Sequence, residues 1–103
     1  MQHSISVKGT VTDFDWSNPH AMIFFDAKNG NNAVQKWSVE IRGGPNVLTR
    51  AGWKKDTLKT GDQLTFIGHP AKDRTNRMRL ERILLANGQE LSPDPPRSSW
   101  WPF

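Results

Sequence analysis

Hydrophobic and polar residues alternate along the first part of the chain, which is the pattern of a half-buried β-strand. The alternation covers residues 4–16. A slip of one residue near Thr12 and Asp13 moves the bulky positions to Phe14 and Trp16. Such a slip predicts a β-bulge in a long, bent first strand. A small barrel uses a strand of this kind, because the strand has to serve two sides of the sheet.

Four further segments carry the pattern of strands, and one short helix lies among them. Asn29 and Gly30 form the strongest hairpin signal, between the second and third strands. Pro45, followed by apolar residues at three- and four-residue spacing, predicts a helix over residues 46–53. The predicted second to fifth strands span residues 20–27, 33–42, 63–69 and 77–85.

This order of elements predicts an all-β fold. It matches a five-stranded antiparallel barrel like that of the oligonucleotide/oligosaccharide-binding (OB) fold, with a short helix between strands three and four. Another small antiparallel barrel or sandwich is the alternative. Residues 1–91 are predicted to form this single OB-like domain, and residues 92–103 a Pro- and Trp-rich tail. We expect the tail to dock on its own barrel, on another copy in a homo-oligomer or on a partner, since large aromatic side chains are costly to leave in water. A frayed end or a tag remnant is the alternative interpretation.

Composition narrows the classes of function. The chain has 103 residues, no cysteine and a net charge of +4, and its mean hydropathy is -0.69. This hydropathy excludes an integral membrane protein, and the missing cysteines exclude disulfides and Cys-type zinc sites. The first residues lack the basic and apolar regions of a signal peptide. The positive charge permits binding of phosphates or of an acidic partner without requiring either.

Two histidines beside prolines are the strongest candidates for a site. His20 stands between a turn at Pro19 and an apolar run, and His69 precedes Pro70. In the predicted barrel the loops that carry them share one end, so we expect the two imidazoles to converge. With the Asp73 carboxylate nearby, they would suit zinc or copper. In the alternative interpretation, both rings bind backbone carbonyl groups and stabilise their loops.

Aromatic and basic residues support a second interpretation. Trp37 and Trp53 would form a stacking surface for bases or sugars, next to basic residues such as Lys36. The alternative places these rings in the core or at its rim. Basic residues also follow the fifth strand and the loop before it, where they would contact phosphates or protect a strand edge. They are Lys72, Arg74, Arg77, Arg79 and Arg82.

Three groups of motifs resemble a known family. They are Gly-Thr-Val with Phe-x-Trp-x-Asn-Pro-His in residues 9–20, Gly-Trp-x-x-Asp-x-Leu-Lys-x-Gly-Asp in residues 52–62, and Gly-His-Pro-Ala-Lys-Asp in residues 68–73. Together they resemble a family of small bacterial exported proteins of unknown function. The resemblance covers about residues 7–91. It implies the fold and a periplasmic or secreted location, but no reaction.

We therefore expect a non-catalytic binding module for a small ligand or a protein partner, with its site between the loops that join strands one and two and strands four and five. Catalysis is not favoured, because the sequence has no nucleophile elbow, phosphate loop or dinucleotide motif. The alternatives are a single-stranded nucleic-acid-binding domain and a metal-binding protein that uses His20 and His69. The expected ligand-binding residues are Trp16, Asn18, His20, Trp37, His69, Lys72 and Asp73.

Overall fold

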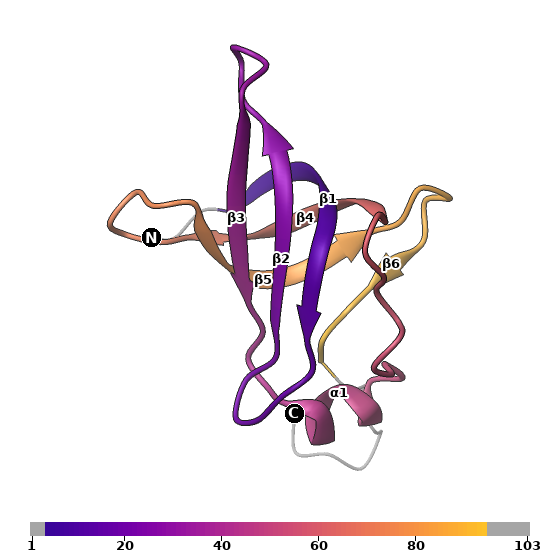
Figure 1. The fold of residues 1–103 in the computed structure, drawn as a ribbon. Helices are drawn as coiled ribbons and strands as arrows, with labels where there is room; N and C mark the ends of the chain where they lie inside the picture. The colour runs from indigo at the N-terminus through magenta and orange to yellow at the C-terminus, as the bar shows by residue number, and fades with distance from the viewer. Residues whose placement is uncertain (1–3, 95–103) are drawn as a thin grey trace.

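The computed structural model describes residues 4–94 and shows a closed barrel of five strands with one short helix (Figure 1). The helix α1 (Pro45–Arg50) lies between the third and fourth strands, so the predicted fold class is confirmed. The strands are β1 (Ile5–Asp15), β2 (Met22–Lys28), β3 (Val34–Glu40), β4 (Gln63–Pro70), β5 (Arg77–Leu84) and the two-residue β6 (Glu90–Leu91).

The barrel closes through a parallel pair of strands. β1 pairs with β2 and β4, β2 pairs with β3, and β4 pairs with β5, all antiparallel. β3 and β5 then complete the ring in parallel, with Ser38 opposite Arg77 and Glu40 opposite Arg79. They share a direction because the chain passes through α1 and the oppositely directed β4 before it returns beside β3. The barrel is therefore mixed, whereas the sequence had indicated antiparallel pairing throughout.

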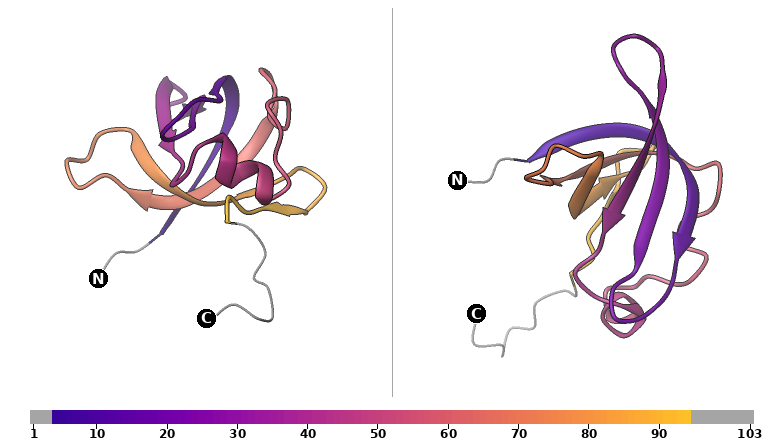
Figure 2. Two further views of the ribbon diagram at one scale, coloured as in Figure 1. Left: turned by 90° about the horizontal axis from the view of Figure 1, so that it is seen from below. Right: turned by 60° about the vertical axis from the view of Figure 1, so that its left-hand side comes forward.

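Two bulges bend the sheet into a barrel. The pairing of β1 with β2 shifts register between Val11 and Asp13, which confirms the slip predicted at Thr12. The bend lets the first half of β1 pair with β4 and the second half with β2, as the curved β1 ribbon in Figure 2 shows. A second shift lies between Ile67 and Gly68, where β5 contributes one residue more than β4.

The core consists of the inward-facing residues of all five strands together with α1 and the segment after it. Phe25 stacks on Phe66 with ring centroids 4.1 Å apart, and Trp37 also stacks on Phe25, with ring centroids 5.9 Å apart. Trp53 is 2% exposed, and its indole Nε1 donates a hydrogen bond to the backbone oxygen of Ser92 at 2.8 Å. The largest fully buried side chains are Val11, Ile23, Phe25, Val39, Ile41, Leu48, Trp53, Phe66 and Ile83.

The start of the predicted tail lies against the barrel. The Trp53 hydrogen bond holds Ser92, and Pro93 is buried. Residues 95–103 lie outside the described residues, and so does the predicted contact between copies through that part of the tail. Across residues 4–94, no helix has the length and apolar character needed to cross a bilayer.

Candidate functional site

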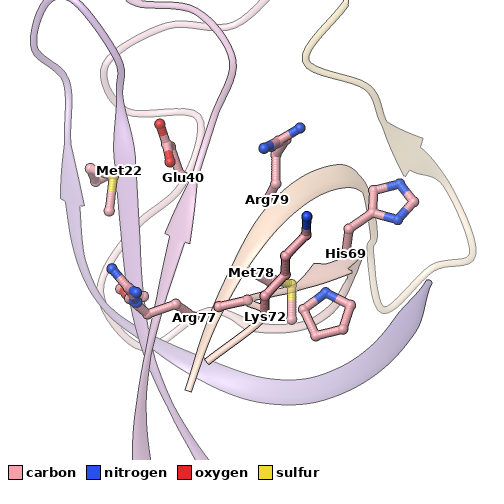
Figure 3. Close-up of a pocket in the computed structure, with 10 residues that line it drawn as sticks. Met22, Glu40, His69, Lys72, Arg77, Met78 and Arg79 are labelled. Atoms are coloured by element: carbon pink, nitrogen blue, oxygen red, sulfur yellow. The ribbon is translucent and has the colours of Figure 1, made fainter. Parts of the chain in front are cut away.

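A cleft opens where β4 ends and β5 begins (Figure 3). Its volume is about 290 Å³. The start of β2 and the end of β3 form one side, and the end of β4, the β4–β5 loop and the start of β5 form the other. The lining residues are Met22, Ser38, Glu40, His69, Pro70, Ala71, Lys72, Arg77, Met78 and Arg79.

Strand register places four of these side chains in one row. Met22 is opposite Glu40, Glu40 is opposite Arg79, and Arg79 is opposite His69. Side chains of directly opposed residues project from the same face of a sheet, so this row runs across the outer surface of β2, β3, β5 and β4. The parallel pairing of β3 with β5 creates the row, since it brings the end of β3 beside the start of β5.

The cleft carries an excess of positive charge. Three cationic side chains, Lys72, Arg77 and Arg79, line it together with the single carboxylate of Glu40. Among the residues that the structure describes, neither Lys72 nor Arg79 makes an ion pair. Figure 3 shows both side chains extending into the opening. Two cations that make no ion pair with the described residues, next to the apolar Met78 and with one carboxylate among three cationic side chains, are suited to an anionic ligand group.

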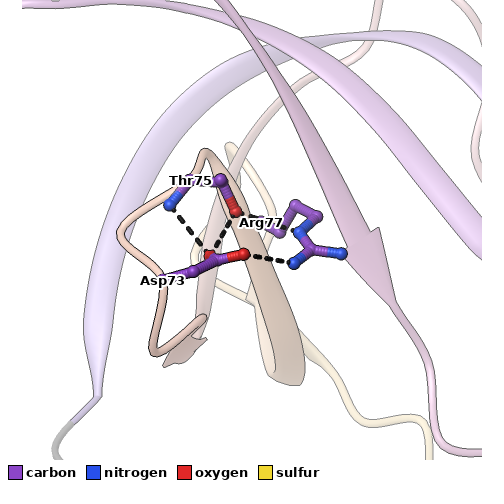
Figure 4. Close-up of polar contacts among 3 residues, drawn as sticks. All are labelled: Asp73, Thr75 and Arg77. Carbon is purple, nitrogen blue, oxygen red and sulfur yellow. Dashed lines mark hydrogen bonds and ion pairs between the residues drawn. The ribbon is translucent and has the colours of Figure 1, made fainter.

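The third cation is held by the β4–β5 loop (Figure 4). The Asp73 carboxylate accepts hydrogen bonds from the Thr75 hydroxyl at 2.7 Å and from the Thr75 backbone N–H at 3.1 Å. Its other oxygen accepts from Arg77 Nη2 at 2.8 Å, and Arg77 Nε donates to the Thr75 hydroxyl at 3.0 Å. The Thr75 hydrogen bonds and the Arg77 charge lower the pKa of Asp73 from 3.8. Asp73 therefore orients Arg77 at the edge of the cleft.

His69 is connected to acidic residues of the neighbouring strands. Its Nε2 lies 3.6 Å from Glu81 Oε1, and the other Glu81 oxygen accepts a hydrogen bond from Arg82. Arg82 Nε in turn lies 3.4 Å from Glu90. The bulge between Ile67 and Gly68 places Glu81 beside His69, because it adds a residue to β5 at that point.

The other predicted histidine belongs to a different part of the surface. His20 is exposed, and its Nδ1 donates a hydrogen bond to the Ile41 backbone oxygen at 3.0 Å. The β1–β2 loop lies against the connection from β3 to α1: Ala21 N donates to Gly43 O at 3.0 Å. Figures 1 and 2 show this loop beside α1 and away from the β4–β5 loop. His20 does not line the cleft that His69 lines.

The remaining predicted ligand residues also lie away from the cleft. Trp16 packs edge-to-face on Phe14, with ring centroids 5.7 Å apart, and Trp37 faces the core through its stack on Phe25. The Asn18 side-chain oxygen lies so close to Gly44 that a Cβ there would come within 2.7 Å of it. The cleft therefore gathers His69 and Lys72 from the predicted set, with Asp73 contacting it through Arg77.

The geometry does not support a zinc or copper site shared by the two histidines. His20 and His69 have different hydrogen-bonding and ionic partners, at Ile41 and at Glu81. Within residues 4–94 no three His, Asp or Glu side chains are grouped so that they could hold a metal ion. The described residues thus favour the alternative in which the His20 ring stabilises its loop through a backbone carbonyl.

Sequence reasoning did not assign Met22, Ser38, Glu40 and Arg79 to the site. Arg77 and Arg79 stood out as part of a basic group on the fifth strand, but Glu40 and Ser38 were only polar positions on a distant strand. These residues come together through the β3–β5 pairing, which the local sequence pattern of neither strand predicts.

A second hollow of about 660 Å³ lies at the opposite ends of the strands. Its lining residues include Lys8, Lys28, Leu64 and Leu85.

The comparisons with known proteins identify the family and the fold. The chain belongs to a family of unknown function, DUF6152, which matches residues 1–79. No curated protein matches the sequence. Among solved structures, the chain is similar to the crystal structure of the ZRD-deleted mutant of TiaS in complex with agmatine, with 21% identity and a TM-score of 0.57. The match covers 92% of this chain and 28% of the TiaS chain, so this chain corresponds to little more than a quarter of that protein.

Proposed function

We propose that this chain is a non-catalytic, OB-like binding module that holds an anionic ligand in the cleft between β3, β5 and the β4–β5 loop. The observation that carries the proposal is the pair of cations, Lys72 and Arg79, that line the cleft without an ion-pair partner among residues 4–94. A carboxylate or phosphate group would supply the missing counter-charge. Hydrogen bonds between charged groups contribute about 1.5–3 kcal/mol each, so two such contacts would support specific binding.

Inorganic phosphate is the simplest probe of the cleft. In an NMR titration of the ¹⁵N-labelled chain, we expect phosphate to shift the amides of His69, Lys72 and Arg79. Arg79→Ala should weaken phosphate binding about tenfold, which corresponds to about 1.4 kcal/mol. Arg50→Ala is the matched control, because Arg50 is an exposed arginine in the last turn of α1. Equal phosphate affinity of the Arg79 and Arg50 variants would refute the proposal.

A nucleic-acid ligand is the remaining anionic alternative from the sequence. Its predicted stacking surface has little support, because Trp53 is 2% exposed and Trp37 stacks on the core residue Phe25. Export to the periplasm stays a prediction from the family resemblance. Cell fractionation of the product of the native gene would test it.

A further inference from the structure

The outer half of β3 has one edge without a partner strand. β3 pairs with β2 over its whole length, but with β5 only at Ser38, Val39 and Glu40. Within the part of the chain that the structure describes, no strand pairs with residues 34–37 on the β5 side. Figure 1 shows this half of the β2–β3 hairpin standing clear of the other strands, and the second view in Figure 2 agrees.

The direction of the backbone groups at this edge follows from a hydrogen bond next to it. Ser38 N donates to Asn76 O at 3.1 Å, so the Ser38 N–H points away from β2. Backbone groups alternate in direction along a strand, and the N–H and C=O groups of Lys36 and Val34 therefore point to the same open side. Val34 is also 59% exposed, which adds apolar surface beside the edge.

The open edge leads directly to the cleft. It ends at Ser38, which lines the cleft and is opposite Arg77. An extended chain that paired with Val34 and Lys36 would reach Arg77 and Lys72 at its end. The side chain of Lys36 adds a further positive charge on the outer face of β3.

We infer that the ligand of the cleft is an acidic segment of a partner polypeptide, which adds as an extended strand to the open edge of β3 and places carboxylates beside Lys36, Arg77 and Lys72. This inference rests on the proposed function. A polypeptide supplies both donors and acceptors to the edge, whereas the phosphates of a nucleic acid only accept hydrogen bonds. A second copy of this chain that paired through its own β3 is disfavoured, because its Lys36 would add another positive charge beside the same cations.

The experiment measures the affinity of the unmodified protein for the peptide (Glu-Thr)₅, acetylated at its N-terminus and amidated at its C-terminus. Two derivatives of this peptide are compared, one with a methyl group on the backbone nitrogen of every Glu and the other with a methyl group on the backbone nitrogen of every Thr. Only one of the two sets of N–H groups can face β3, so one derivative should bind at least tenfold more weakly than the other. Equal affinities of the two derivatives would overturn the inference.

Variants of the edge give a second, independent readout. Lys36→Pro removes an N–H that points to the open side and leaves the hydrogen bonds to β2 intact, whereas Lys36→Gln removes only the charge. We expect the proline variant to lose peptide binding at least tenfold relative to the glutamine variant, with circular dichroism confirming that both are folded. Equal peptide affinity of the two folded variants would count against strand addition.

Two further probes separate the inference from the proposed function. Phosphate binding that depends on Arg79, combined with equal binding of the two methylated peptides, would remove strand addition and leave the anion cleft in place. If the unmodified protein binds neither phosphate nor the peptide, both the anion cleft and the strand addition are refuted. A (dT)₁₀ oligonucleotide should bind more weakly than (Glu-Thr)₅ at equal ionic strength, and tighter binding of the oligonucleotide would overturn the peptide assignment in favour of nucleic acid.

Discussion

Gly68→Ala tests whether the bulge between β4 and β5 sets the geometry of the cleft. Gly68 is buried opposite Leu80, and a Cβ at this position would lie 2.2 Å from the backbone oxygen of Arg79. A close carbon–oxygen contact is about 3.3 Å, so one of the two strands would have to move by about 1 Å. Overpacking of this kind costs about 1–3 kcal/mol, and we expect the upper half of that range because the obstacle is backbone.

The expected result is a lower melting temperature and weaker phosphate binding. A loss of about 2–3 kcal/mol corresponds to a fall in Tm of roughly 8–24 °C for a domain of this size. Phosphate binding should weaken as well, because the two strands that are forced apart carry His69 on β4 and Arg79 on β5. Thermal unfolding and urea denaturation measure the stability, and the phosphate titration measures the cleft.

Gly30→Ala is the matched control for this substitution. A Cβ on Gly30 meets no heavy atom within 4 Å. The added methyl group restricts the unfolded chain, so stability should stay unchanged or rise by about 0.4–1 kcal/mol. If Gly68→Ala melts at the same temperature as Gly30→Ala, the close approach of the two strands does not determine the stability of this region.

Two further predictions concern the start of the tail and the loop. Trp53→Phe should lower the free energy of unfolding by about 1–3 kcal/mol in urea denaturation, because it removes the indole donor and part of a buried ring. Ser92→Ala keeps the accepting backbone oxygen and should change little, so equal losses would contradict this account. The Asp73 carboxyl should titrate below 3.8 in carbon-detected NMR, and Thr75→Ala should raise the midpoint. Because the pKa of Asp73 is lowered, the stabilising effect of its carboxylate is present above pH 3.8 and is lost as the pH falls through the lowered pKa. If the titration midpoint of Asp73 is the same in the Thr75→Ala variant, the Thr75 hydrogen bonds do not lower this pKa.

Much of the barrel follows from patterns within single segments. The bulge at Thr12 was visible as a phase slip, since a one-residue shift changes which side chains face the core. The apolar face of Trp37, Val39 and Ile41 was visible as alternation, and all three face or contact the core. The predicted helix is shorter than expected and ends at Arg50, because Gly52 has a positive φ of 93° that a helix does not continue through.

The site was predicted less well than the fold, for a physical reason. A histidine beside a proline in a loop is expected to have a fixed backbone. The partner of its side chain, however, depends on which strands lie next to each other in the folded barrel. His20 reached the carbonyl of Ile41 through the β3–α1 connection, and His69 reached Glu81 through a bulge. Neither contact is encoded within the segment that carries the histidine.

By itself, the sequence determined the local states of the chain: alternation made strands, Asn-Gly made the hairpin turn, and the order of elements indicated a small barrel with a helix before its fourth strand. Only the tertiary structure decided which ends of those strands meet. The parallel contact of β3 with β5 joins residues about 40 positions apart, and it places Glu40 and Arg79 in one row while leaving the outer half of β3 with an open edge. Period-two patterns state which face a side chain occupies, but the neighbour across the sheet is set by how the closed barrel satisfies its backbone hydrogen bonds.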